Sequence, residues 1–278
     1  MLTNLRLAQI YAVLRLELKK TFFSKRGLWV YLLAFSPVVL FGGHSLLMLK
    51  RGQPCDFGLD TNIFATVFQM FYLRLAVFFG CLGIFMNLFR GEVLDKSLHY
   101  YFLAPIRREV LMAGKFLAGL LVAITTFCLS IVLQFIALYV HYDSSTMQEY
   151  LFRGHGLWHL SAYVGVTALA CLGYGSVFLA AGIFMRNPII PAATILVWEA
   201  ANPFLPALLQ KFSVIYYLKS LCPIDVSTDI GPPFNLFMVT VDPISPAIAI
   251  PGVLAVAALV VLWAGRRIRK MEISYGTE

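Results

Sequence analysis

The sequence is poor in charged residues. Asp, Glu, Lys and Arg make up only 13% of its 278 residues, about half the share found in a soluble domain. Apolar residues make up 60%. So few charges cannot cover a water-soluble protein of this length, which excludes a secreted disulfide scaffold, a disordered chain and a nucleic-acid-binding module. The composition indicates a membrane protein, and the formal net charge of +8 is first of all a topology signal.

Motifs for catalysis and nucleotide binding are also missing. The chain has no GxxxxGK[ST] motif to hold nucleotide phosphates, and no HExxH or GxSxG motif. The nearest group of metal ligands is His155 and His159, one helical turn apart, with His141 and Asp143 in the same external connection. Zinc needs three or four converging ligands, so these histidines are better interpreted as interfacial residues. We expect no enzymatic activity and no cofactor in this chain.

Cysteine is scarce, with five residues and no CxxC spacing. Cys55 and Cys222 fall in segments expected outside the membrane, so a disulfide between them is conceivable. A lone cysteine is more often a small packing residue.

Long apolar runs are abundant. A membrane-spanning helix needs about 20 mostly apolar residues, and the sequence offers six such runs: 28–49, 63–89, 110–140, 157–185, 188–209 and 246–265. The first run is too long for a cleaved signal peptide and has no small-residue cleavage site after it. The sequence therefore predicts an all-α polytopic membrane protein with six spans, forming one transmembrane domain over residues 1–278.

The distribution of positive charge predicts the orientation. Six spans put both termini on one side, and sixteen Lys and Arg residues fall in the segments on that side, against five in the external connections. Because cytoplasmic loops carry the excess of positive charge, we expect cytoplasmic N- and C-termini. The expected location is the inner (plasma) membrane of a bacterial cell.

Residues 1–24 do not form a span but an amphipathic helix. Apolar residues recur on one helical face: Leu7, Tyr11, Leu14, Leu18 and Phe22. Polar residues project elsewhere: Gln9, Glu17, Lys19 and Lys20. A basic helix of this kind is typical of the headgroup plane of a bilayer.

Small residues in the third and fourth spans predict close helix packing. In the third span Gly114 precedes Ala118, and Gly119 precedes Ala123, each by four residues. The fourth span contains four glycines: Gly165, Gly173, Gly175 and Gly182.

The connection at residues 90–105 predicts a short amphipathic helix on the cytoplasmic side. Its apolar face carries Leu94, Leu98, Tyr101 and Phe102, and Pro105 ends the helix. Such a helix lies on the membrane or docks on a partner protein, and the same apolar stripe serves either purpose.

The sequence around this connection, FRGEVLDKSLHYYFLAPIRREVLMAGKFLAGLL, combines an acidic residue, K[ST]L, an aromatic pair, LAPIRRE and a GKxLAGLL entry into the next span. This pattern resembles the signature of the permease subunits of type-2 ABC exporters, and the six-span layout with an N-terminal interfacial helix is similar over the whole chain. Many members have Gly-Thr where this chain has Lys96 and Ser97, so the subfamily stays open.

The resemblance implies that residues 90–105 form a coupling helix on a separately encoded ATPase, which would bind the ATP and Mg. Two permeases and two ATPases would make the transporter. The candidate ATPase-coupling residues are Glu92, Leu94, Asp95, Lys96, Leu98, His99, Tyr100, Tyr101 and Arg107.

The same family carries a partly re-entrant element after the fifth span. Here the region from Asn202 to Pro251 contains eight prolines, and broken helices at membrane depth are tolerated only against protein or a water-filled cavity. We expect residues 210–245 to form an external gate, with a plain extracellular loop as the alternative.

Two charged residues lie deep in predicted spans. Arg74 and Glu199 each sit eleven residues into a span, about 16 Å deep and near the bilayer midplane. Because a lone charge there costs about 3 kcal/mol or more, such residues usually pair. The pair would be either an architectural ion pair or a polar point on a substrate path.

The sequence therefore predicts the membrane-spanning permease subunit of an ATP-driven exporter. Its expected partners are cytoplasmic ABC ATPase subunits, a second protomer, like or unlike, and the lipid bilayer, with no nucleic acid. The many aromatic residues hint at an amphipathic or lipid-like substrate. The alternative function is a membrane scaffold or assembly protein that transports nothing.

Overall fold

The computed structural model describes residues 2–22, 27–51, 56–94, 103, 106–185, 187, 189–226 and 244–269. Every regular element in these ranges is a helix, and they contain no β-strand. In chain order the elements are α1 (Leu2–Phe22), α2 (Leu28–Arg51), α3 (Phe57–Val67), η2 (Phe68–Val77), α4 (Phe78–Leu94), α6 (Arg108–Tyr139), α7 (Ser144–Gln148), η3 (Glu149–Arg153), α8 (Gly156–Phe184), α9 (Ile189–Ala201), η4 (Asn202–Phe204), α10 (Ala207–Gln210), α11 (Val214–Ser220) and α12 (Pro246–Arg269).

Five helices in the described ranges are long and apolar enough to cross a membrane: Leu28–Arg51, Phe57–Phe89, Arg108–Tyr139, Gly156–Phe184 and Pro246–Arg269. They match five of the six predicted spans. The predicted span at 188–209 differs, because α9 ends at Ala201 and the chain turns through η4 before α10. The helix ends just before two closely spaced prolines, Pro203 and Pro206. Proline has no N–H, so it cannot donate the hydrogen bonds that a continuing helix needs.

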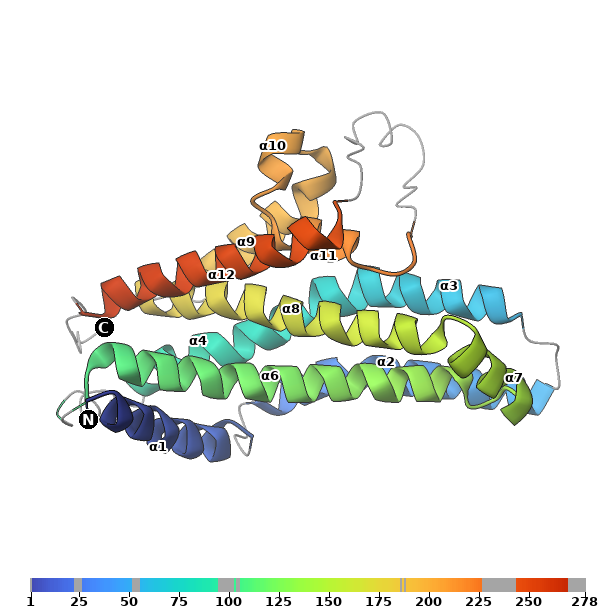
Figure 1. Cartoon of the computed structure of the whole chain (residues 1–278), viewed down its shortest axis with the longest axis horizontal. Coiled ribbons are helices and arrows are strands. Elements are labelled where there is room, and N and C mark those ends of the chain that lie inside the picture. The colour runs from blue at the N-terminus through green and yellow to red at the C-terminus, as the bar shows by residue number, and fades with distance from the viewer. Residues whose placement is uncertain are drawn as a thin grey trace.

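The five long helices run along the long axis of the molecule (Figure 1). α8 packs against α4, α6 and α12, while α2 packs mainly against α6. The start of α1 and the end of α12 lie at the same end of the bundle, which we call the termini end (Figure 1). α7 lies at the opposite end.

The ends of α8 and α12 show how the chain returns. Phe184, the last residue of α8, stacks on Trp263 near the end of α12, with ring centroids 4.0 Å apart. Both helices therefore run toward the termini end, so residues between them must lead the chain back. The segment from α9 to α11 projects from the bundle on the side of α12 (Figure 1).

Proline inside α2 is accommodated by hydroxyl groups. Pro37 lacks an N–H, so the Leu33 carbonyl one turn earlier loses its helical partner. The Ser36 hydroxyl donates to that carbonyl at 3.0 Å. The neighbouring carbonyl of Ala34 accepts a hydrogen bond from Ser130 of α6, which ties α2 to α6 where the backbone is weakest.

The predicted small-residue contacts are largely confirmed. A Cβ added at Gly182 would lie 3.3 Å from the backbone of Met86, so α8 and α4 approach closely only because residue 182 has no side chain. A Cβ at Gly114 would lie 2.9 Å from Val13, which seats α1 on α6. Gly165 faces open space and makes no such contact.

The helix predicted over 1–24 is observed as α1, but it uses a different face from the one expected. The predicted apolar stripe is mostly exposed, with Leu7 64% and Tyr11 65% accessible. Val13 and Glu17 are buried against α6 instead. The exposed stripe leaves apolar surface for a bilayer, as a helix in the headgroup plane requires.

Candidate functional site

Charged residues from three helices meet inside the bundle near the termini end. The ammonium nitrogen of Lys115 on α6 lies 2.7 Å from Glu17 Oε1 of α1 and 2.6 Å from Glu92 Oε1 of α4. Lys20 of α1 lies 3.0 Å from the same Glu92 oxygen. We call these four residues the charge cluster.

The charge cluster is desolvated on one side and open on the other. The side chain of Lys115 is 0% exposed and those of Glu17 and Glu92 are 2% exposed, whereas that of Lys20 is 50% exposed. Charge-assisted hydrogen bonds at these distances are among the stronger ones in proteins, and a buried charge is tolerated only when it is paired. The cluster therefore fixes α1 and the end of α4 to α6.

Burial of Glu92 corrects one expectation. We predicted Glu92 on the polar face of a coupling helix that begins at residue 90, where it would contact a partner ATPase. The helix of the second span instead continues to Leu94 and turns Glu92 inward toward Lys115. Glu92 is only 1% exposed, so it is not accessible to a partner in this structure.

The remaining coupling candidates are only partly described. Leu94 is the last residue of α4, and Arg107 is exposed immediately before α6. The other predicted contacts lie outside the described residues: Asp95, Lys96, Leu98, His99, Tyr100 and Tyr101.

The start of α6 is also joined to the end of α12 at the termini end. Arg269 forms an ion pair with Glu109, and Arg108 donates a hydrogen bond to the Arg269 carbonyl. These contacts are largely exposed, so each contributes little stability. They show that the start of α6 lies beside the last described residue of α12.

A second polar cluster surrounds Glu199 of α9. Its Oε2 accepts hydrogen bonds from the Ser213 hydroxyl at 2.8 Å and from the Ile215 N–H at 3.0 Å, and its Oε1 accepts one from the Val214 N–H at 3.0 Å. The Tyr174 hydroxyl of α8 lies 3.5 Å from Oε2. Glu199 is 8% exposed, so its carboxylate satisfies the first N–H groups of α11 and ties α9 to that helix.

Arg74 lies near Glu199 but does not bind it directly. The charges of the two residues interact through space, yet among the described residues no nitrogen of Arg74 lies within 4.0 Å of a Glu199 oxygen. The buried Nε of Arg74 has no hydrogen-bond partner there. Burial, and after it the positive charge of Arg74, lowers the pKa of Lys219 on α11. Arg74 and Glu199 thus lie near each other but form no ion pair, because backbone N–H groups of α11 bind the Glu199 carboxylate.

Arg74 lies in η2, a π-helical segment that we did not predict from the sequence. The ten residues of η2 interrupt the helix from Phe57 to Leu94. π-helical turns are rare and are frequently found at functional sites. They also change which side chains share a face, so an α-helical extrapolation fails through this segment.

At the opposite end of the bundle, Asp60 of α3 contacts polar side chains of α2 and of the turn that follows α6. Its two oxygens each lie 3.3 Å from a histidine Nε2, of His44 and of His141, and Tyr142 donates to it at 2.9 Å. Ser45 lies 3.1 Å from His141 Nδ1, which superficially completes a Ser-His-Asp chain. Ser45 is 1% exposed and donates to two backbone carbonyls of α6, so it is not available as a nucleophile.

The predicted histidine pair makes other contacts. The rings of His155 and His159 stack with centroids 6.0 Å apart, and His159 Nδ1 lies 3.1 Å from the Tyr150 hydroxyl. Asp143 caps α7 by accepting from Ser145. In the part of the chain that the structure describes, no three His, Cys, Asp or Glu side chains form a group that could hold a metal ion.

Cys222 carries a free thiol, and Cys55 lies outside the described residues. Burial raises the pKa of Cys222 to about 12, so this thiol stays protonated and unreactive at neutral pH. It follows α11 and donates a weak hydrogen bond to the Leu218 carbonyl.

Together the described helices define an all-helical protein whose long apolar helices are those of a membrane-embedded protein. The sequence matches no family model and no curated protein. The functional assignment therefore depends on the residues and contacts described above.

Proposed function

We propose that this chain is the membrane-spanning permease subunit of an ATP-driven ABC exporter of the type-2 class. In this proposal it works as a dimer, and a separately encoded ATPase docks on the connection between α4 and α6. The observation that carries the proposal is the place of that connection. The helices that it joins, α4 ending at Leu94 and α6 beginning at Arg108, both carry residues of the charge cluster near the termini end, and the connecting sequence has the K-S-L and LAPIRRE pattern.

The charge cluster supports a mechanical role for the connection. A force applied between Leu94 and Arg108 would reach α4 through Glu92 and α6 through Lys115, and both are bonded to α1. Since Glu92 and Lys115 are almost fully buried, α1 and the ends of α4 and α6 would move as one unit. A docked ATPase would then move two spans together.

The segment from α9 to α11 supports the expected external element. Because α8 and α12 both run toward the termini end, residues between them must recross the membrane, and α9 provides the first part of that crossing. Glu199 then holds α11 against α9. We assign α9 to the fifth crossing and α11 to the re-entrant element, which gives six crossings and two termini on the cytoplasmic side.

Exposed apolar surface on α9 and α12 supports a second protomer. Val197 is 67% exposed, and Leu259 and Trp263 are 67% and 57% exposed. These residues would face either lipid or a second copy. We place the second protomer on this side because α9 packs little against the rest of its own chain.

Co-purification tests the proposal. The tagged chain is purified from cells in a mild detergent, and we expect it to bring along a soluble protein with a Walker A motif. Replacing Leu98 and Tyr101 with Asp should abolish that association and leave the chain folded. A matched control, Phe152→Asp, changes an exposed apolar residue at the opposite end of the bundle and should retain it. Equal ATPase recovery with all three proteins would contradict docking on the connection.

A further inference from the structure

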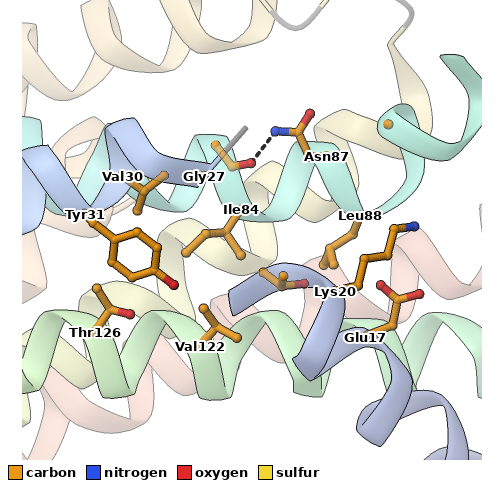
Figure 2. A pocket seen from close by; sticks show the side chains of 13 residues that line it. Glu17, Lys20, Gly27, Val30, Tyr31, Ile84, Asn87, Leu88, Val122 and Thr126 are labelled. Atoms are coloured by element: carbon orange, nitrogen blue, oxygen red, sulfur yellow. Dashed lines mark hydrogen bonds between the residues drawn. The ribbon is translucent and has the colours of Figure 1, made fainter. Parts of the chain in front are cut away.

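A cavity of about 100 Å³ lies between α1, α2, α4 and α6, next to the charge cluster (Figure 2). Its inner wall is apolar and includes Val30 of α2, Ile84 of α4 and Val122 of α6. Lys20 of α1 and Asn87 of α4 line its outer part, and both are exposed. The cavity is thus polar at its mouth and apolar inside.

The polar groups at the mouth have capacity for a ligand. The Lys20 ammonium binds Glu92 at 3.0 Å, but its side chain is half exposed and has three donors in all. The Asn87 amide nitrogen donates to the Gly83 carbonyl at 2.6 Å, and its oxygen points away from that contact (Figure 2). The mouth therefore presents one cationic donor and one neutral acceptor, while the carboxylate of Glu17, which also lines the cavity, is bonded to Lys115.

A hydroxyl group lies deeper in the cavity. Thr126 of α6 is 4% exposed, and within the described ranges its hydroxyl has no hydrogen-bond partner, whereas the neighbouring Thr125 hydroxyl donates to the Leu121 carbonyl at 2.7 Å. The Thr126 oxygen is not one of the fully buried atoms without a partner in the described ranges, so this hydroxyl is open to the cavity and can donate a hydrogen bond to an acceptor that enters it.

The position of the cavity along the bundle indicates which part of the bilayer it faces. It lies between the start of α2, at Tyr31 and the preceding Gly27, and the last turns of α4, at Asn87 and Gly91. In a membrane-embedded bundle, these turns lie where the spans pass from hydrocarbon to headgroups. The molecules most concentrated at that level are lipids, with a charged head, ester carbonyls and apolar chains in that order.

We propose that this cavity binds one glycerophospholipid from the leaflet at the termini end. Its phosphate accepts hydrogen bonds from Lys20, an ester carbonyl accepts one from Thr126, and the first methylenes of an acyl chain contact Val30, Ile84 and Val122. An apolar cavity of about 150 Å³ takes a benzene molecule, so this smaller one holds only a short part of the lipid, and the rest stays in the bilayer. The site stands on the cavity alone and does not depend on the proposed transport function.

Adjacent threonines on α6 provide a matched test. Thr126→Phe fills the cavity and removes the unpartnered hydroxyl, while Thr125→Phe places the same ring on the exposed side of the helix. The full chain is purified in a non-lipid detergent, and bound phospholipid is counted by native mass spectrometry. We expect the wild type and Thr125→Phe to retain one phospholipid per chain and Thr126→Phe to lose it by about tenfold or more.

Several outcomes would overturn the proposal: no phospholipid on the wild type, equal retention by the two threonine variants, or a retained detergent or fatty acid in place of the phospholipid. If Thr126→Phe does not fold, as judged by its melting curve, a second pair of variants tests the same site. Lys20→Gln removes the cation at the mouth and leaves Lys115 on Glu92, whereas Lys19→Gln changes an exposed neighbour outside the cavity. We expect phospholipid loss only with Lys20→Gln, and equal retention by both would refute the site.

Discussion

Removing the buried ammonium of Lys115 should destabilise the bundle more than any surface charge change. Lys115→Met keeps a side chain of similar length but deletes the bonds of 2.7 Å to Glu17 and 2.6 Å to Glu92. Glu92 keeps Lys20 at 3.0 Å, whereas Glu17 loses its bond of 2.7 Å to the Lys115 ammonium. Because breaking a buried ion pair from one side costs about 3 to 5 kcal/mol, we expect a loss of that size in the free energy of unfolding.

The assay is chemical unfolding in detergent micelles, followed by the helical circular dichroism signal. Lys19→Met is the control, since Lys19 is exposed on the same helix as Lys20, and it should change stability by less than about 0.5 kcal/mol. Replacing Glu17 and Glu92 by Gln in the Lys115→Met background removes the carboxylate charges that Lys115 neutralised and should restore most of the loss. If Lys115→Met is as stable as Lys19→Met, the claim that this cluster fixes α1 to the bundle is wrong.

Three further outcomes follow from the packing, the polar contacts and the topology. Gly182→Leu should force α8 away from α4 and cost about 3 kcal/mol, whereas Gly165→Leu, which faces open space, should cost little; equal melting midpoints would contradict the close approach. In a double-mutant cycle, Glu199→Ala should cost about 2 to 3 kcal/mol by leaving buried N–H groups unsatisfied. Because no ion pair joins Glu199 to Arg74, we expect their coupling energy to stay below about 1 kcal/mol, and a stronger coupling would indicate a direct pair. In a chain without native cysteines, Gln148→Cys should react with a membrane-impermeant maleimide in intact cells, and labelling only after lysis would reverse the topology.

Apolar run length was enough to predict most of the fold. Five of the six predicted spans are long helices within about two residues at most ends, because a run of twenty apolar residues has few alternatives to a helix in a membrane. The second span is longer at both ends than predicted, beginning at Phe57 and continuing to Leu94. Its polar ends, such as Asp60 and Glu92, are buried by partners far apart in the sequence, which hydropathy does not detect.

The candidate site was harder to predict, for the same reason. Glu92 and Glu17 look like residues of a solvated face, and only their contact with Lys115 makes them interior residues. Equal depth predicted that Arg74 and Glu199 lie in one region, but depth carries no information about the α11 backbone that binds Glu199. The local sequence predicts where a helix forms and how deep each residue lies in the membrane. Which charged residues pair across helices depends on tertiary packing.

ATP hydrolysis tests the proposed function most directly. The complex of this chain with its co-purified ATPase is reconstituted in lipid nanodiscs, and the rate is compared with that of the ATPase alone. We predict stimulation by the wild-type chain and none by the variant carrying Leu98→Asp and Tyr101→Asp, which should insert and melt normally. Full stimulation by that variant, or no stimulation by the wild-type chain, would contradict the proposal that this protein is an ATP-coupled permease.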